Sequence, residues 1–221
     1  MNITKYIYNQ ILPKLFKLQS RSGWIPIVKD LIKTKKRAIE YLDLRAGNTV
    51  LVSSVGAGFE LGFILQKIGT TGSVIGVDFA QGMLREAQDV INKNKWNNVQ
   101  LVQRDLREYQ PEHELGYKVD AVLSNFGYLD DEVLVRLIEV LKPGGRIAIS
   151  GPQPLTGFRK ILYPITFIPE MAFGLTWKSL HDMSKYMATL RKECNDVVMN
   201  ENTFGKYFVV VAGQKPIIDK N

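Results

Sequence analysis

The stretch TVLVSSVGAGFELG, residues 49–62, decides the fold. Its first part, TVLVSSV, is short, apolar and rich in β-branched residues, which is typical of a buried strand. Gly56 and Gly58 follow at once, and residues 60–68 then show the apolar spacing of a helix that stops at Gly69. A strand that enters a helix through a glycine turn allows the backbone to approach a nucleotide closely.

The alternation of strand and helix continues along the chain. Apolar runs predict further strands at residues 73–78, 99–103, 119–124 and 146–150, with helices between them. A helix near 131–141 ends at the KPGG stretch, where Pro143 blocks continuation and two glycines allow a tight turn into the last strand. Strands that are apolar on both faces and alternate with helices predict a parallel sheet covered by helices on both sides.

The segment before this alternating part has a helical pattern. Pro13 predicts a break or kink in a first helix, and Pro26 stands at the favoured first position of a second one. Gly47 is placed where a left-handed cap would end that second helix. The N-terminal part is therefore expected to be helical up to the first strand.

The alternation of strand and helix patterns stops after residue 150. Residues 151–177 mix prolines with large apolar side chains, too broken for one helix and too apolar for a solvated linker, so we interpret them as a hydrophobic lid. Residues 195–212 predict two strands around NENTFG. We therefore predict one domain, 1–221, which consists of N-terminal basic helices (1–47), a cofactor-binding core (48–150), a lid or acceptor segment (151–194) and a C-terminal hairpin (195–221).

Composition narrows the classes of protein. With 45% hydrophobic and 23% charged residues, the 221-residue chain can bury one sizeable core. A single cysteine, Cys194, excludes an internal disulfide and suits a reducing compartment. Neither a run of about 18 apolar residues nor an apolar N-terminal signal occurs, so we expect a cytoplasmic protein.

The positive charge is concentrated near the N-terminus. Residues 1–45 hold ten Lys or Arg and three acidic residues, which accounts for the whole net charge of +7. One interpretation is peripheral contact between these basic helices and an anionic membrane. The other is that the helices pack over the sheet with their lysines solvated. Few aromatic residues accompany the charge, so no nucleic-acid partner is expected.

Polar side chains follow three predicted strands that are consecutive along the chain. Asp78 ends the second strand about 20 residues after the first glycine, the spacing at which an acidic residue binds the hydroxyls of a ribose. Asp105 follows the third strand, where a carboxylate can accept from the exocyclic amine of adenine, and Asn125 ends the fourth. These side chains can converge on one adenosine at the carboxyl edge of the sheet. The alternative is that Asp78 and Asp105 cap the helices that follow them.

Taken in order, these motifs resemble the class I S-adenosylmethionine-dependent methyltransferases, and among them the branch that methylates quinones, lipids and other small molecules. The resemblance covers about residues 45–150 and rests on TVLVSSVGAGFE, IGVDFAQGML, QRDLREY, VDAVLSNFGYL and VLKPGGRIAIS. It implies an α/β fold with a Rossmann-like, doubly wound, mainly parallel seven-stranded sheet whose last strand is antiparallel. It also implies an enzyme with S-adenosyl-L-methionine as cofactor.

The resemblance assigns roles to individual residues. Asp78 would hold the ribose, Phe79 and Met83 would flank the adenine, and Asp105 with the Leu106 amide would read the adenine edge. No metal site is predicted. The predicted cofactor-binding residues are Ser54, Gly56, Ala57, Gly58, Asp78, Phe79, Met83, Asp105, Leu106 and Asn125.

Two positions depart from the family pattern. Ser54 stands where the family usually has an acid, two residues before the first glycine, and Glu60 stands where it usually has a glycine. One hypothesis is that Glu60 supplies the missing negative charge to the ammonium group of the cofactor. Another is a catalytically inactive binding or scaffold protein that keeps the fold. A nicotinamide cofactor is disfavoured, because its enzymes continue G-x-G-x-x-G and start their sheet near the N-terminus.

The chemistry of the cofactor limits what the protein must supply. A sulfonium methyl group is already activated, so transfer needs mainly an acceptor held in line in a dry site. A base is needed only for a hydroxyl or an acidic carbon. His181 is a better candidate than His113, but an exposed helical histidine is the favoured alternative, and no catalytic residue is assigned. SNFGY after the fourth strand is not the Pro-Pro-Tyr pattern of base methylation. The lid and the basic helices favour a small hydrophobic or lipid-like acceptor.

Overall fold

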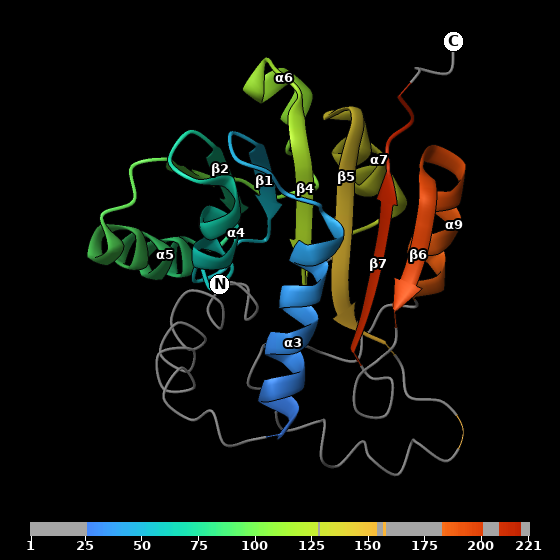
Figure 1. Cartoon of the computed structure of the whole chain (residues 1–221), viewed down its shortest axis with the longest axis horizontal. Coiled ribbons are helices and arrows are strands. Elements are labelled where there is room, and N and C mark those ends of the chain that lie inside the picture. The colour runs from blue at the N-terminus through green and yellow to red at the C-terminus, as the bar shows by residue number, and fades with distance from the viewer. Residues whose placement is uncertain (1–25, 128, 154–156, 158–182, 201–207, 218–221) are drawn as a thin grey trace.

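Seven strands form a single sheet in the order β3-β2-β1-β4-β5-β7-β6 (Figure 1). The computed structural model describes residues 26–127, 129–153, 157, 183–200 and 208–217. Most of the predicted lid, the first N-terminal helix and His181 lie outside the described residues. The strands are β1 (Thr49–Ser53), β2 (Ser73–Asp78), β3 (Val99–Gln103), β4 (Val119–Asn125), β5 (Leu141–Pro152), β6 (Asn195–Asn200) and β7 (Phe208–Gln214).

The strand directions confirm the predicted doubly wound sheet. Strands β1 to β5 pair in parallel, β7 runs antiparallel to β5, and β6 runs antiparallel to β7. From β1 the chain winds outward to β2 and β3, then returns to place β4 on the other side of β1. The switch point of the sheet is therefore between β1 and β4, where open α/β sheets bind their ligands.

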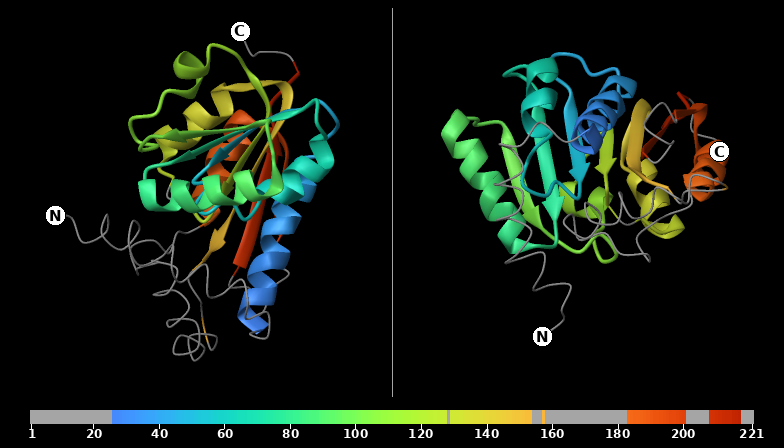
Figure 2. Two further views of the ribbon diagram at one scale, coloured as in Figure 1. Left: turned by 90° about the vertical axis from the view of Figure 1, so that its left-hand side faces the viewer. Right: turned by 90° about the horizontal axis from the view of Figure 1, so that it is seen from below.

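Helices cover both faces of the sheet (Figure 2). Their apolar sides and the alternating side chains of the strands form two cores, one on each face. In β1, for example, Leu51 faces one core while Val50 and Val52 face the other, and all three are 0% exposed. One face carries α3 (Pro26–Tyr41), α4 (Leu61–Ile68) and α5 (Gln81–Asn94), and the other carries α6 (Pro111–Leu115), α7 (Asp131–Glu139) and α9 (Met183–Glu193).

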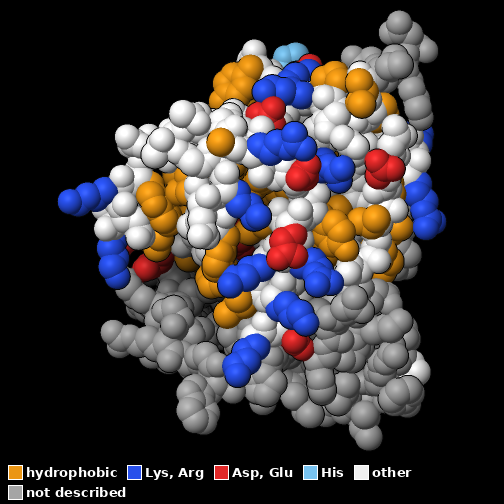
Figure 3. All heavy atoms as spheres, in the orientation of Figure 1, with side chains coloured by type: hydrophobic (Ala, Val, Ile, Leu, Met, Phe, Trp, Pro, Cys, Tyr) orange, Lys and Arg blue, Asp and Glu red, His pale blue; other side chains and the backbone are white. Residues whose placement is uncertain are grey.

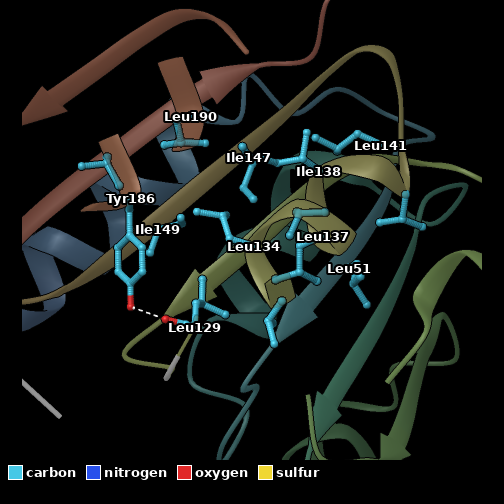
Figure 4. Close-up of a cluster of buried hydrophobic side chains, with 14 of the residues drawn as sticks. Leu51, Leu129, Leu134, Leu137, Ile138, Leu141, Ile147, Ile149, Tyr186 and Leu190 are labelled. Carbon is cyan, nitrogen blue, oxygen red and sulfur yellow. Dashed lines mark hydrogen bonds between the residues drawn. The ribbon is translucent and has the colours of Figure 1, made fainter. Parts of the chain in front are cut away.

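The core under α7 and α9 contains one buried polar anchor. Leu134 and Leu137 of α7 pack with Leu190 of α9 and with Ile147 of β5 (Figure 4). The Tyr186 hydroxyl on α9 donates a 3.0 Å hydrogen bond to the carbonyl of Leu129, so the hydroxyl keeps a hydrogen-bond partner although the ring is buried. The bond fixes α9 to the loop that precedes α7.

The end of α3 differs from its prediction. The helix begins at Pro26 as expected but ends at Tyr41, well before Gly47. Asp43 already adopts a left-handed conformation with φ 47, so the chain leaves the helix there. Gly47, with φ 85, instead donates its amide to the carbonyl of Ile68 at 2.9 Å and turns the chain into β1. Gly47 therefore forms the turn that leads into β1 and does not cap α3.

The KPGG stretch also differs from its prediction. It lies inside β5 and is not a turn before it, because Leu141 already pairs with Val119. The next pair in the register joins Arg146 to Ala121, so the residues between form an irregularity in the strand, with Gly144 at φ 78. The amide of Gly144 donates to the carbonyl of Lys215 at 3.1 Å. Pairing with the segment after β7 therefore replaces the expected turn.

Candidate cofactor site

The carboxyl ends of β1, β2 and β4 lie side by side at the switch point. Ser53, the last residue of β1, is in register with Val77 and with Ser124. The residues that follow β1 and β4, Ser54 and Phe126, both adopt left-handed backbone conformations, with φ 60 and φ 61. Such conformations cost a non-glycine residue about 1–3 kcal/mol, and they cluster at functional sites.

The two glycines of the loop after β1 have different surroundings. Both have positive φ, 54 at Gly56 and 77 at Gly58. A Cβ at Gly58 would lie 2.9 Å from Leu61 Cδ1 and 3.2 Å from Ala87 Cβ, so this glycine allows α4 and α5 to pack closely. A Cβ at Gly56 would meet nothing within 4 Å. Gly56 therefore presents bare backbone to open space, while Ala57 between the two glycines is half-buried.

Asp78 ties this loop to the start of α5. Its Oδ2 accepts from the Gly56 amide at 2.8 Å and its Oδ1 accepts from the Ala80 amide at 2.9 Å. Burial raises the pKa of Asp78, and the backbone amides of Ala80, Gly56 and Phe79 oppose that rise. The N-cap position of α5 is Ala80, which has no side-chain cap bond, so Asp78 bridges two loops rather than acting as that cap. A carboxylate offers about four acceptor positions, which leaves capacity for a further donor.

Asp105 after β3 is engaged by its own turn. Its Oδ1 accepts from the backbone amide of Arg107 at 3.1 Å and from the Nε of the same residue at 3.0 Å. Arg136 donates to the carbonyls of Leu106 and Arg107 at 3.2 and 3.0 Å, which holds the turn in place. The next helix begins only at Pro111, so Asp105 forms a local turn and not a helix cap. Its ion pair is exposed on the arginine side, and such pairs are weak.

The predicted adenine-flanking residues lie at the start of α5. Phe79 follows Asp78 directly and is half-buried, and Met83 on the first turn of the helix is 4% exposed. Leu106 is half-buried against the core under α7. The structure thus brings an aromatic ring, a thioether and an aliphatic side chain to the ends of β2 and β3. Their contact with an adenine stays a prediction.

Asn125 belongs to a polar network that sequence reasoning missed. Its Nδ2 donates to Glu60 Oε1 at 3.2 Å, and its Oδ1 accepts from the Ser150 hydroxyl at 2.5 Å. Lys35 on α3 completes the network with an ion pair of 2.6 Å to Glu60 Oε1. No sequence motif connects Lys35 with this site, and only the unusual position of Glu60 could have drawn attention to it. The cofactor contact predicted for Asn125 stays a prediction.

Ser54 and Ser124 line the floor of the switch point. A Cβ at Gly127 would lie 2.4 Å from Ser54 Oγ and 3.2 Å from Ser124 Oγ, so only a glycine allows the loop after β4 to approach so closely. The buried Ser124 hydroxyl has no hydrogen-bond partner in the described part of the chain. A buried hydroxyl without a partner marks a place where a water or a ligand atom can bind.

The residues present fit an adenosine-containing cofactor. Gly56 provides open backbone, Asp78 provides a buried acceptor with spare capacity, and the half-buried Phe79 provides an apolar ring beside it. Within the described ranges, no three His, Cys, Asp or Glu side chains gather in a group that could hold a metal ion. An open, mainly parallel sheet with a glycine turn after its first strand and an acid at the end of its second defines the Rossmann-like class of nucleotide-binding domains.

Comparisons with known proteins narrow this class. Residues 50–145 match the family model described as a methyltransferase domain. An arsenite methyltransferase of Halobacterium salinarum is 34% identical over 108 residues, which cover 47% of this chain and 27% of that protein. A demethylmenaquinone methyltransferase of Oceanobacillus iheyensis is 30% identical over 135 residues, 58% of this chain and 56% of that protein. The crystal structure of an S-adenosylmethionine-dependent methyltransferase from Aquifex aeolicus has a TM-score of 0.63 at 21% identity and covers 92% of this chain and 98% of that one.

Residues 50–145 of this chain therefore match a methyltransferase domain, and the fold of the chain resembles that of a solved S-adenosylmethionine-dependent methyltransferase. S-adenosylmethionine is the cofactor that these comparisons support. The chain covers about a quarter of one of the two curated relatives named above and about half of the other. In the described part of the chain, no helix is both long and apolar enough to cross a membrane.

Proposed function

We propose that the protein transfers the methyl group of S-adenosylmethionine to a small-molecule acceptor. The observation that carries this proposal is the position of Asp78, a buried carboxylate that joins the glycine loop to α5 at the switch point of the sheet. The match of residues 50–145 to a methyltransferase domain supports it. The comparisons give no support to an inactive scaffold, since both curated relatives named above are methyltransferases.

The residues of this chain would bind and orient the cofactor. Asp78 would accept hydrogen bonds from the ribose hydroxyls, and the open backbone at Gly56 would allow the cofactor to approach the loop. Phe79 and Met83 would flank the adenine, and Asp105 with the Leu106 amide would read the adenine edge. The bound cofactor supplies a methyl group on a positively charged sulfur, so the protein contributes mainly alignment and exclusion of water.

The acceptor that we propose is hydrophobic and quinone-like or lipid-like. The relative named as a demethylmenaquinone methyltransferase supports this class. Phe59, beside the glycine loop, is 41% exposed and lies 5.6 Å from the ring of Phe63, while Phe126 after β4 lies 5.6 Å from the ring of Phe208. These aromatic rings near the switch point suit a planar apolar acceptor better than a small polar one.

We further propose peripheral contact with an anionic membrane. Figure 3 shows Lys and Arg side chains gathered over α3, where Lys29, Lys33 and Lys36 are exposed. The Lys36 ammonium lies 4.6 Å from the centre of the Phe63 ring, so charge and apolar surface adjoin each other there. Each lysine near anionic headgroups contributes about 1 kcal/mol of binding free energy, and neighbouring aromatic rings can insert beside them.

Ligand-induced stabilisation tests the cofactor assignment. S-adenosylhomocysteine at 100 times its Kd should stabilise the protein by about 2.7 kcal/mol, and NADH at equal concentration should not. Products that are heavier by CH₂ in a native lipid extract incubated with the protein and S-adenosylmethionine would then identify the acceptor. If S-adenosylhomocysteine shifts Tm no more than NADH does, the proposed function is wrong.

A further inference from the structure

The ion pair between Lys35 and Glu60 connects α3 to the glycine loop. Lys35 Nζ lies 2.6 Å from Glu60 Oε1, and the two side chains are 12% and 3% exposed. The same Glu60 oxygen accepts from Asn125 Nδ2, which lies on β4, and Asn125 in turn accepts from Ser150 on β5. One chain of polar contacts therefore runs from α3 across the start of α4 to the ends of β4 and β5.

Aromatic rings surround the lysine in this chain of contacts. The Lys35 ammonium lies 5.2 Å from the centre of the Phe59 ring and 5.5 Å from that of the Phe126 ring, distances at which a cation is attracted to a ring face. Phe126 holds the strained φ of 61 noted above, and its amide donates to the Ser150 carbonyl at 2.7 Å. Lys35 thus lies between the residue that follows the glycine turn and the residue that follows β4.

Removing one partner of this ion pair leaves the other charge unpaired, and the cost differs between Glu60 and Lys35. Glu60 is almost completely buried, so its negative charge has no access to water if Lys35 is removed. Lys35 keeps a little exposure and two ring faces, and its long side chain can turn toward solvent if Glu60 loses its charge. Loss of Lys35 should therefore disturb the loop more than loss of the Glu60 charge.

We propose that Lys35 is a positioning residue of the cofactor cleft, which acts through Glu60 to hold the glycine loop against the ends of β4 and β5. This inference rests on the proposed function, because the cleft concerned is the proposed cofactor site. It reassigns Glu60 as well. The carboxylate neutralises Lys35 inside the protein and does not serve as a free charge for the cofactor ammonium.

A double-variant experiment tests the proposal. The Kd of S-adenosylhomocysteine is measured by calorimetry for the full chain and for Lys35→Met, Glu60→Gln and the variant with both changes. Lys67→Met, at an exposed position of α4, is the control for loss of a lysine charge. All measurements are made at a temperature where circular dichroism shows each variant to be folded.

Each outcome supports or overturns the proposal. Lys35→Met should weaken binding about tenfold or more and Glu60→Gln by a smaller factor, while the double variant should return to within about threefold of the wild type. Lys67→Met should bind S-adenosylhomocysteine as the wild type does. If Glu60→Gln weakens binding more than Lys35→Met does, Glu60 serves the cofactor directly and the proposal is wrong.

Two further outcomes keep the test decisive. A purely structural role would lower Tm in the single variants and leave Kd unchanged, which overturns the proposal. If Lys35→Met does not fold, the double variant and Glu60→Gln still decide, because a positioning role requires that removing both charges preserves binding. Failure of the wild type to bind S-adenosylhomocysteine would instead refute the proposed function.

Discussion

Asp78 Oδ2 accepts a hydrogen bond from the amide of Gly56 at 2.8 Å, although the two residues belong to turns after different strands. The contact places a carboxylate directly beneath the open backbone of the glycine loop. Because Asp78 is 6% exposed, its partners are the protein and whatever binds in the cleft. Asp78 therefore holds two loops together and, in the function that we propose, also binds the cofactor.

Asp78→Asn should weaken both folding and binding. An amide offers one acceptor oxygen, so Gly56 or Ala80 would lose its partner and face an NH₂ group. We expect the free energy of unfolding to fall by about 1–3 kcal/mol and S-adenosylhomocysteine to bind about tenfold or more weakly. Urea titration and calorimetry measure the two effects, with Asp89→Asn on the exposed side of α5 as the control. If the Kd of S-adenosylhomocysteine is unchanged in Asp78→Asn, Asp78 does not bind the cofactor.

The raised pKa of Asp78 predicts how stability and affinity depend on pH. A carboxyl group whose pKa in the folded protein is raised above 3.8 favours folding in its protonated form. Its contribution to stability is complete below pH 3.8 and is lost as the pH rises through the folded pKa. Affinity should change in the opposite direction, because ionised Asp78 is the better acceptor for ribose hydroxyls.

Titration of both properties between pH 4 and 7 checks this expectation. The free energy of unfolding of the wild type, minus that of Asp78→Asn, should decline with rising pH and then level off. The Kd of S-adenosylhomocysteine should decrease over the same interval in the wild type alone. Parallel pH profiles for the two proteins would show that other groups cause the dependence.

The two loop glycines should respond differently to alanine. Gly58→Ala adds a Cβ within 3.2 Å of Ala87 to the cost of a positive φ, so we expect it to reduce stability by about 2–3 kcal/mol. Gly56→Ala meets no neighbour within 4 Å and should cost about 1 kcal/mol for its φ alone. Its methyl group would project into the proposed cofactor space and reduce affinity more than stability. Measurements of Tm and Kd for both variants test this contrast. It is contradicted if the loss of affinity relative to the loss of stability is the same for Gly56→Ala as for Gly58→Ala.

Tyr186→Phe should affect stability alone. The variant leaves the Leu129 carbonyl without its 3.0 Å donor in the core under α7 and α9. We expect the free energy of unfolding to fall by about 1–3 kcal/mol while the Kd of S-adenosylhomocysteine stays unchanged. Tyr117→Phe, at a position that is 49% exposed, is the control for loss of a hydroxyl. A weakened Kd would show that this core is coupled to the cleft.

Neutralising the exposed lysines of α3 should weaken membrane contact. Replacing Lys29, Lys33 and Lys36 with glutamine should cost about 3 kcal/mol of binding to anionic vesicles, about 100-fold in affinity at low salt. Co-sedimentation with phosphatidylserine vesicles measures the loss, with neutral phosphatidylcholine vesicles as the reference. Absence of wild-type binding to anionic vesicles at low salt would end the membrane proposal. Methyl transfer in detergent should be unaffected, because these exposed side chains take no part in the contacts that join Lys35, Glu60 and Asn125.

Much of the fold followed from local pattern. The β-branched runs, the glycine turn and the apolar spacing of the helices predicted the parallel strands and the antiparallel hairpin at the end, because each is a property of neighbouring residues. The predicted ends of elements were wrong where contacts with residues distant in the sequence determine them. Pairing with Val119 extends β5 through the KPGG stretch, and the carbonyl of Ile68 accepts from Gly47, so that this glycine leads into β1 and does not end α3.

The same distinction between local pattern and distant contacts applies to the residues of the site. The sequence by itself determined that Gly56, Asp78 and Asn125 stand at or just after the ends of strands, since each strand is an apolar run of adjacent residues. Only the tertiary structure decided which polar atoms are paired. Lys35 and Glu60 are 25 residues apart and Glu60 and Asn125 are 65 apart, so no periodicity connects them. Burial makes their pairing necessary, and burial is a property of the packed chain.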